Sequence, residues 1–177
     1  MNAAALTGIT VRPATYEDLP TIAELHVKAW QQAYIGQIDQ SYLDSLDAAK
    51  RLDMWQQIFS KQDARHGLLL AEVAGHAAGF ISYGPPREAA PPGSDVEIGA
   101  LYTLSPYWSK GVGFRLFTTA HAHFKDQHYK QSYLWVLDTN HRAIESYRRW
   151  GGQFQEGLMN QLIGTKNVQE FCVVFDV

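Results

Sequence analysis

The apolar positions of the chain fall into about seven short strand-like runs and about four helical stretches. Ile9–Pro13 alternates between apolar and polar residues and stops at a proline, which predicts an opening strand. A helix should follow, with Thr15 or Asp18 as its N-cap and Pro20 in its first turn. Helical spacing of apolar residues then predicts a second helical region from about Gln40 to Phe59.

The middle and the end of the chain are richer in strand signals. Leu68–Val73 is a continuous apolar run, typical of a buried strand, and Ala78–Tyr83 is its expected hairpin partner. Gly84–Ser94 holds four of the seven prolines, so we expect a long surface loop rather than a helix or a central strand. Near the C-terminus, Phe154–Ile163 and Val168–Val177 predict two closing strands.

The resulting order of elements is β-α-α-β-β-β-α-β-α-β-β. A chain of 177 residues is long enough for one domain with a substantial core. We therefore predict a single domain over residues 1–177, of the α/β (α+β) class, built around a mixed sheet.

One strand–loop–helix unit carries candidate chemistry. Leu101–Leu104 predicts a strand that Pro106 closes, and a helical apolar face begins at Gly113. Between them, Ser109–Gly113 contains two glycines, which let a ligand approach the backbone, and the first amides of a helix have no internal acceptor. With the helix dipole, such amides suit an anion, best a phosphate. The alternative is that the glycines only let the helix pack closely on the sheet.

A second constellation lies on a late helix, which Asn140 should cap and Gly151–Gly152 should end. Asn140, Ala143 and Tyr147 are spaced by three and four residues, so they share one helical face. Taken alone, the three residues also fit a cap, a small packing residue and a half-buried tyrosine.

Composition and charge narrow the classes of function. The formal net charge of −3 argues against a nucleic-acid partner, and no apolar run is long enough to span a membrane. Met1–Ile9 has neither a basic start nor a long apolar core, so we expect no secretory signal. The single cysteine, Cys172, cannot form an internal disulfide and fits a reducing cytoplasm. The seven histidines lack metal-ligand spacing, so we expect no metal.

The strand–loop–helix unit resembles motif A of the GNAT superfamily of N-acetyltransferases, an E-x-x-x-L-Y-V strand that leads into (R/Q)-x-x-G-x-(G/A). Leu101–Thr103 fills the L-Y-V slot, and Gly111 and Gly113 fill the glycine slots. Trp108 stands in the Arg/Gln slot, a departure whose effect on cofactor binding stays open.

The late helix resembles motif B of the same family, N-x-x-A-x-x-x-Y-x-x-x-G-F. Asn140, Ala143, Tyr147 and Gly151 fall in register, and Gly152 stands where Phe is usual. The resemblance covers nearly the whole chain from Ile9 and implies the GNAT fold, here a mostly antiparallel mixed sheet of about seven strands flanked by about four helices.

The resemblance implies an acetyl-CoA-dependent N-acetyltransferase, with acetyl-CoA as co-substrate and no acyl-enzyme. By this likeness, Glu97 would deprotonate the acceptor amine directly or through water, and Tyr147 would protonate the leaving thiolate. The positions implied for cofactor binding are Leu101, Tyr102, Thr103, Ser109, Lys110, Gly111, Val112, Gly113, Phe114, Asn140 and Ala143.

The acceptor is the least determined part of this interpretation. Trp30 and Tyr34 are helical neighbours that, with Tyr83, are expected to wall the acceptor pocket, although core packing explains the first two equally well. The loop Gly84–Ser94 is a candidate lip of that pocket. The expected acceptor is a small primary amine such as an amino acid, polyamine or aminoglycoside. The alternatives are a protein N-terminus or lysine, or a non-catalytic acyl-CoA-binding module, and a homodimer is left open.

Overall fold

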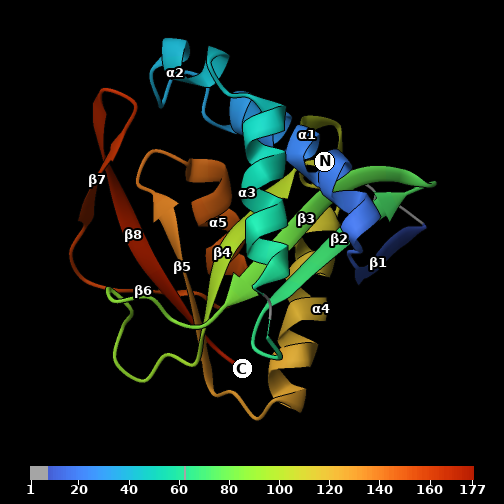
Figure 1. Ribbon diagram of the computed structural model, residues 1–177. Coiled ribbons are helices and arrows are strands. Elements are labelled where there is room, and N and C mark those ends of the chain that lie inside the picture. Colours follow the sequence, from blue (N-terminus) through green and yellow to red (C-terminus); the bar gives the residue numbers. More distant parts are fainter. Residues whose placement is uncertain (1–7, 62) are drawn as a thin grey trace.

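A mixed sheet organises the fold, and Figure 1 shows the helices that cover it. The computed structural model describes residues 8–61 and 63–177. The strands are β1 (Ile9–Pro13), β2 (Gly67–Val73), β3 (His76–Gly84), β4 (Val96–Thr103), β5 (Gln131–Leu137), β6 (Gln153–Phe154), β7 (Met159–Ile163) and β8 (Lys166–Asp176). The α-helices are α1 (Leu19–Ala33), α2 (Gln40–Asp44), α3 (Ala48–Ser60), α4 (Val112–Asp126) and α5 (His141–Arg149).

The eight strands are ordered β1-β2-β3-β4-β5-β8-β6, and β7 pairs with β8. Every neighbouring pair is antiparallel except β4 and β5, which are parallel. This architecture confirms the predicted fold class. In the described part of the chain, no helix is long and apolar enough to cross a membrane. Positions 1–7 of Met1–Ile9, the segment expected not to be a secretory signal, lie outside the described residues.

Two predicted elements are each divided in two. The helical region expected from Gln40 to Phe59 breaks between α2 and α3, where the Asp47 carboxylate caps α3 by accepting from the amide of Ala49. The strand expected over Phe154–Ile163 is interrupted at Gly157, whose φ of 89° is in the left-handed region. The structure therefore has one more strand and one more α-helix than the pattern predicts.

The sheet has an apolar layer on each face. Helix α4 packs Val112, Leu116 and Phe124 against one face, in a core that includes alternate strand residues. Helices α1 and α3 cover the other face, where Ile22 and Trp55 are buried. In Figure 1, α3 crosses in front of the sheet and α4 lies behind it.

Strands β4 and β5 are paired over only two residue pairs, Val96 with Ser132 and Glu97 with Tyr133. The register of β4 against β3 shifts at Gly99, which is left without a partner in a β-bulge. Because a bulge bends its strand, β4 turns away from β5 beyond this point. The β5-facing edge of β4 from Ile98 to Thr103 consequently pairs with no strand of the described chain.

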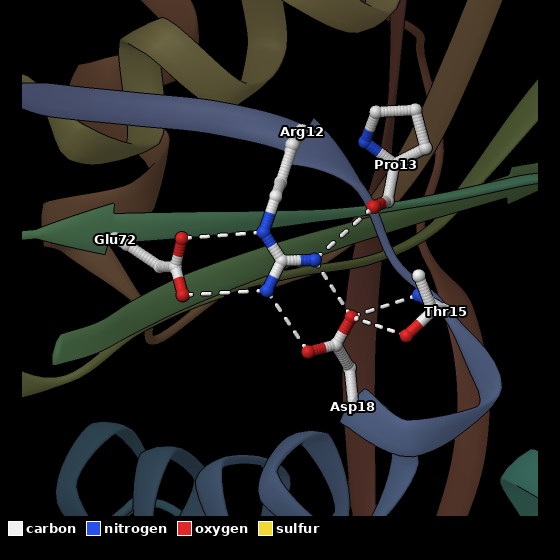
Figure 2. A network of polar contacts seen from close by, with 5 residues as sticks. All are labelled: Arg12, Pro13, Thr15, Asp18 and Glu72. Carbon is white, nitrogen blue, oxygen red and sulfur yellow. Dashed lines mark hydrogen bonds and ion pairs between the residues drawn. The ribbon is translucent and has the colours of Figure 1, made fainter. Parts of the chain in front are cut away.

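Arg12 ties the start of α1 to the edge of the sheet, as Figure 2 shows. Its guanidinium donates to both Asp18 oxygens at 2.7 and 2.9 Å, and to both Glu72 oxygens at 3.2 and 3.3 Å. Asp18 in turn accepts from the amide and hydroxyl of Thr15 at 2.8 and 3.1 Å, on either side of the short 3-10 turn Tyr16–Asp18. Asp18 is the N-cap of α1 by position, but its side chain makes no capping hydrogen bond to that helix. The network joins β1, β2 and the first turn before α1.

Replacing Asp18 with Asn should weaken this network. The hydrogen bonds from Arg12 hold the pKa of Asp18 well below its usual value, against the effect of burial. A carboxyl whose folded pKa is lowered stabilises the fold above pH ~4 and loses that contribution as the pH falls. We expect Asp18→Asn to cost about 1 kcal/mol at pH 7 in urea unfolding, with the difference shrinking progressively below pH 4.

The matched control is Asp63→Asn, which removes the partner of Arg65 in an ion pair that is exposed on both sides. This variant should leave the unfolding midpoint unchanged. A loss at Asp18→Asn that is the same at pH 7 and pH 2.5 would show that the carboxylate charge contributes nothing.

Candidate functional site

A cavity of about 220 Å³ lies where β4 and β5 diverge, bounded also by the start of α4, by α5 and by the end of α1. Most of the residues predicted for binding or catalysis line it: Tyr34, Leu101, Tyr102, Thr103, Ser109, Gly111, Gly113, Phe114, Asn140, Ala143 and Tyr147. Five others do not: Trp30, Tyr83, Glu97, Lys110 and Val112. The two constellations found in the sequence thus meet in one place.

The mouth of the cavity carries a set of open backbone donors. Gly111 is the N-cap of α4 with a φ of 93°, and it brings no side chain that could cap the helix. The amides of Ser109–Phe114 find no acceptor among the described residues outside the helix. Lys110 turns its ammonium back to the carbonyl of Pro106 at 2.7 Å, and Val112 is buried in the core. The open amides and the helix dipole make this the natural place for an anion.

Trp108, in the slot where the resemblance expects Arg or Gln, positions a cation from another helix. Its indole N–H donates to the Thr103 carbonyl at 2.9 Å, which fixes the ring beside the end of β4. The guanidinium carbon of Arg142 lies 3.8 Å from the centre of that ring. Arg142 lines the cavity, burial lowers its pKa, and its guanidinium has no hydrogen-bond acceptor among the described residues. A cation without a partner therefore lies close to the open amides.

Helix α5 supplies a polar face to the cavity. The side-chain oxygen of Asn140 accepts from the amide of Ala143 at 3.3 Å and caps the helix. Two turns on, Tyr147 is 9% exposed, and its hydroxyl has no hydrogen-bond partner in the described part of the chain. Burial, aided by the neighbouring phenol of Tyr102, raises the pKa of Tyr147, so the phenol is a neutral proton donor at physiological pH.

Aromatic side chains close the cavity towards α1. The hydroxyl groups of Tyr34 and Tyr102 are 3.3 Å apart, and burial raises the pKa of both phenols. Trp30 lies behind them, with its ring centre 5.0 Å from that of Tyr34, and its buried N–H has no partner among residues 8–61 and 63–177. Trp30 therefore supports the wall, and only Tyr34 of this helical pair lines the cavity.

Tyr83 lies on the opposite side of the sheet from the place predicted for it. Side chains alternate along a strand, so Tyr83 shares the face of Ile81, which α4 covers. Its hydroxyl lies 3.0 Å from Nδ1 of His123, and its ring packs edge-on against Phe124. The structure thus places Tyr83 in the α4 layer rather than in an acceptor pocket.

Glu97 lies just outside the cavity, one residue before the lining pair Ile98 and Gly99. It is 4% exposed, and its carboxylate is held by Arg87 and by the hydroxyl of Tyr133. Sequence reasoning missed Arg87. The sequence feature that could have indicated it is the position of Arg87 as the single cation of a mostly uncharged loop, next to Pro85 and Pro86.

Among the described residues, no group of three or more His, Cys, Asp or Glu side chains is placed to hold a metal ion. What the site offers is an open strand edge, an anion-binding helix start, an unpartnered arginine and a neutral phenol. Such a site can hold an extended anionic ligand and donate a proton near its inner end.

Comparisons with known proteins found sequence relatives and similar folds. The sequence model described as the Acetyltransferase (GNAT) family matches residues 22–152. The uncharacterized N-acetyltransferase YuaI of Bacillus subtilis (strain 168) is 34% identical over 138 residues, which cover 77% of this chain and 76% of that protein.

Two solved structures share the fold. A PaiA N-acetyltransferase from Thermoplasma acidophilum in complex with coenzyme A has a TM-score of 0.74 at 20% identity, covering 97% of this chain and 100% of that chain. A ribosomal-protein-alanine N-acetyltransferase from Brucella melitensis has a TM-score of 0.71 at 19% identity, covering 95% and 99%.

The protonation state of Tyr147 can be tested by spectrophotometric titration of phenolate. In the folded protein at pH 10.5, Tyr147→Phe should show the same phenolate signal as the wild type, because burial keeps Tyr147 protonated. In concentrated urea, where all nine tyrosines are exposed, the variant should lose one ninth of the signal. A smaller signal in the folded variant would contradict the buried, neutral phenol.

Proposed function

This chain belongs to the GNAT family of acetyltransferases and is an acetyl-CoA-dependent N-acetyltransferase, and we propose that it acetylates the primary amine of a small molecule by direct attack in a ternary complex. The observation that carries the proposal is the convergence of the open β4 edge, the start of α4 and Tyr147 on one cavity. A single buried cysteine among the described residues supports a reducing, cytoplasmic setting.

The residues of the cavity fit the parts of acetyl-CoA. The open amides of Ser109–Phe114 would hold the pyrophosphate, and the Arg142 guanidinium would add the cation that Trp108 does not carry. The unpaired edge at Leu101–Thr103 would bond the pantetheine arm as an added strand does, beside Asn140 and Ala143. When bound there, acetyl-CoA supplies a thioester carbonyl open to attack and a thiolate that can leave.

Two side chains of this protein would transfer protons during the reaction. The Glu97 carboxylate would take a proton from the acceptor's ammonium, directly or through water, since an ammonium has no lone pair. The Tyr147 hydroxyl would give its proton to the leaving sulfur and regain one from solvent. Two observations support this role: the Tyr147 phenol is protonated at neutral pH, and the residue lines the cavity.

The closed end of the cavity favours a small acceptor over a protein. Tyr34 and Tyr102, joined through their hydroxyls and supported by Trp30, close it towards α1. A peptide N-terminus remains the second candidate because the Brucella structure of the same fold is named as a ribosomal-protein-alanine N-acetyltransferase.

The proposal is tested by thiol release from acetyl-CoA with a panel of small amines and N-terminal peptides. Tyr147→Phe should keep CoA affinity, measured by calorimetry, and lower turnover by roughly 10- to 1,000-fold, at or below the usual range for acid catalysis. The matched control is Tyr83→Phe, which removes a phenol that does not line the cavity and whose hydroxyl contacts His123, and which should leave turnover unchanged. Turnover of Tyr147→Phe equal to that of the wild type would exclude Tyr147 as the acid.

A further inference from the structure

The carboxylate of Glu97 is saturated with hydrogen bonds. Arg87 donates from Nε to both oxygens, at 3.0 and 2.8 Å, and from Nη2 to Oε1. The hydroxyl of Tyr133 donates to Oε2 at 2.8 Å. A base must offer a lone pair to the proton that it takes. In this arrangement neither oxygen is free to receive a proton from an acceptor.

The two partners of this ion pair are unequally buried. The side chain of Glu97 is 5% exposed, whereas that of Arg87 is 74% exposed. The guanidinium therefore covers the carboxylate from the solvent side and can move into water without leaving a void in the core. Removing Tyr133 instead would disrupt packing, because its ring is completely buried.

The backbone that carries Arg87 is anchored independently of the ion pair. The amide of Arg87 donates to the Tyr133 hydroxyl at 3.1 Å, and its carbonyl accepts from the amide of Ala90 at 2.9 Å. Ala90 packs against a cluster that contains Tyr133, Cys172 and Val174. The side chain of Arg87 can therefore swing away while the loop stays in place.

We propose that the guanidinium of Arg87 occupies the subsite of the acceptor's ammonium on Glu97, so that a primary ammonium ion binds by displacing it. This rests on the proposed function. The displaced arginine points into water, and the ammonium donates to the same carboxylate oxygens. One N–H proton then passes to Glu97, the nitrogen lone pair forms the bond to the acetyl carbon, and the carbon–sulfur bond breaks with the sulfur taking the Tyr147 proton. The acylated nitrogen then loses its second proton to solvent, from which the Tyr147 phenolate regains one.

The charges around Glu97 favour a cation in this subsite. Glu170 of β8 is half-buried and has no ion-pair partner in the described chain. Burial and the charge of Glu97 raise the pKa of Glu170, whereas the charge of Arg87 lowers it. Burial and the same Glu97 charge raise the pKa of Cys172 to about 11, and burial raises that of Tyr133 to about 12. With Arg87 swung out, two carboxylates and two neutral groups remain. The subsite should therefore take an ammonium ion and reject neutral or anionic groups.

Propylammonium is a probe that needs no knowledge of the natural acceptor. In Arg87→Gly the subsite is vacant, and about 100 mM propylammonium should raise the melting temperature by about 3 °C relative to the same concentration of sodium chloride. The double variant Arg87→Gly/Glu97→Gln and the control Arg65→Gly, at an exposed ion pair, should show no such rise. No rise in Arg87→Gly, or an equal rise in the double variant, would overturn the proposal.

Arg87→Gly leaves a buried carboxylate without its counter-ion and can fail to fold, so Arg87→Lys provides a second test. Lysine keeps the charge but loses the bidentate contact. Propylammonium should stabilise this variant at a concentration about fivefold lower than the wild type needs, and an equal response would overturn the proposal. Calorimetry with CoA separates the two hypotheses: no CoA binding by the wild type refutes the proposed function, whatever propylammonium does.

Discussion

The divergence of β4 from β5 is the constraint on which the site depends. The two parallel strands share only two residue pairs before the bulge at Gly99 bends β4 away. Continued pairing would have used the backbone groups of Ile98–Thr103 and filled the space between the strands. Their early separation leaves a cavity and, on one wall of it, a row of hydrogen-bonding groups that need a partner.

Opposite charges are kept apart around this opening. Towards α4 and α5 lie donors that have no acceptor among the described residues: the amides at the start of α4 and the guanidinium of Arg142 on Trp108. Around the paired end of β4 it gathers the carboxylates of Glu97 and Glu170, with Arg87 as counter-ion. An anionic co-substrate and a cationic acceptor would thus approach from different sides. Tyr147, a neutral phenol, lines the space between the strands.

Local patterns predicted most of the elements, because periodicity and capping residues are properties of short segments. Asp18 at the N-cap position of α1 and the glycine turn after α5 are examples. The pattern does not say which helix covers which face of the sheet, so it could not tell that Tyr83 lies under α4 or that Trp30 stands behind Tyr34. The pairing of Arg87 was missed for a similar reason, because its partner Glu97 lies ten residues further on, in the strand that follows the proline-rich loop.

The central claim is that the opening between β4 and β5 holds acetyl-CoA through backbone groups. Hydrogen exchange of the full chain with and without CoA measures this directly. The account predicts slower exchange of the open amides in Ser109–Phe114 and of those on the β5-facing edge of Ile98–Thr103, with α3 on the opposite layer unchanged. CoA binding that leaves both segments exchanging as fast as before would contradict it.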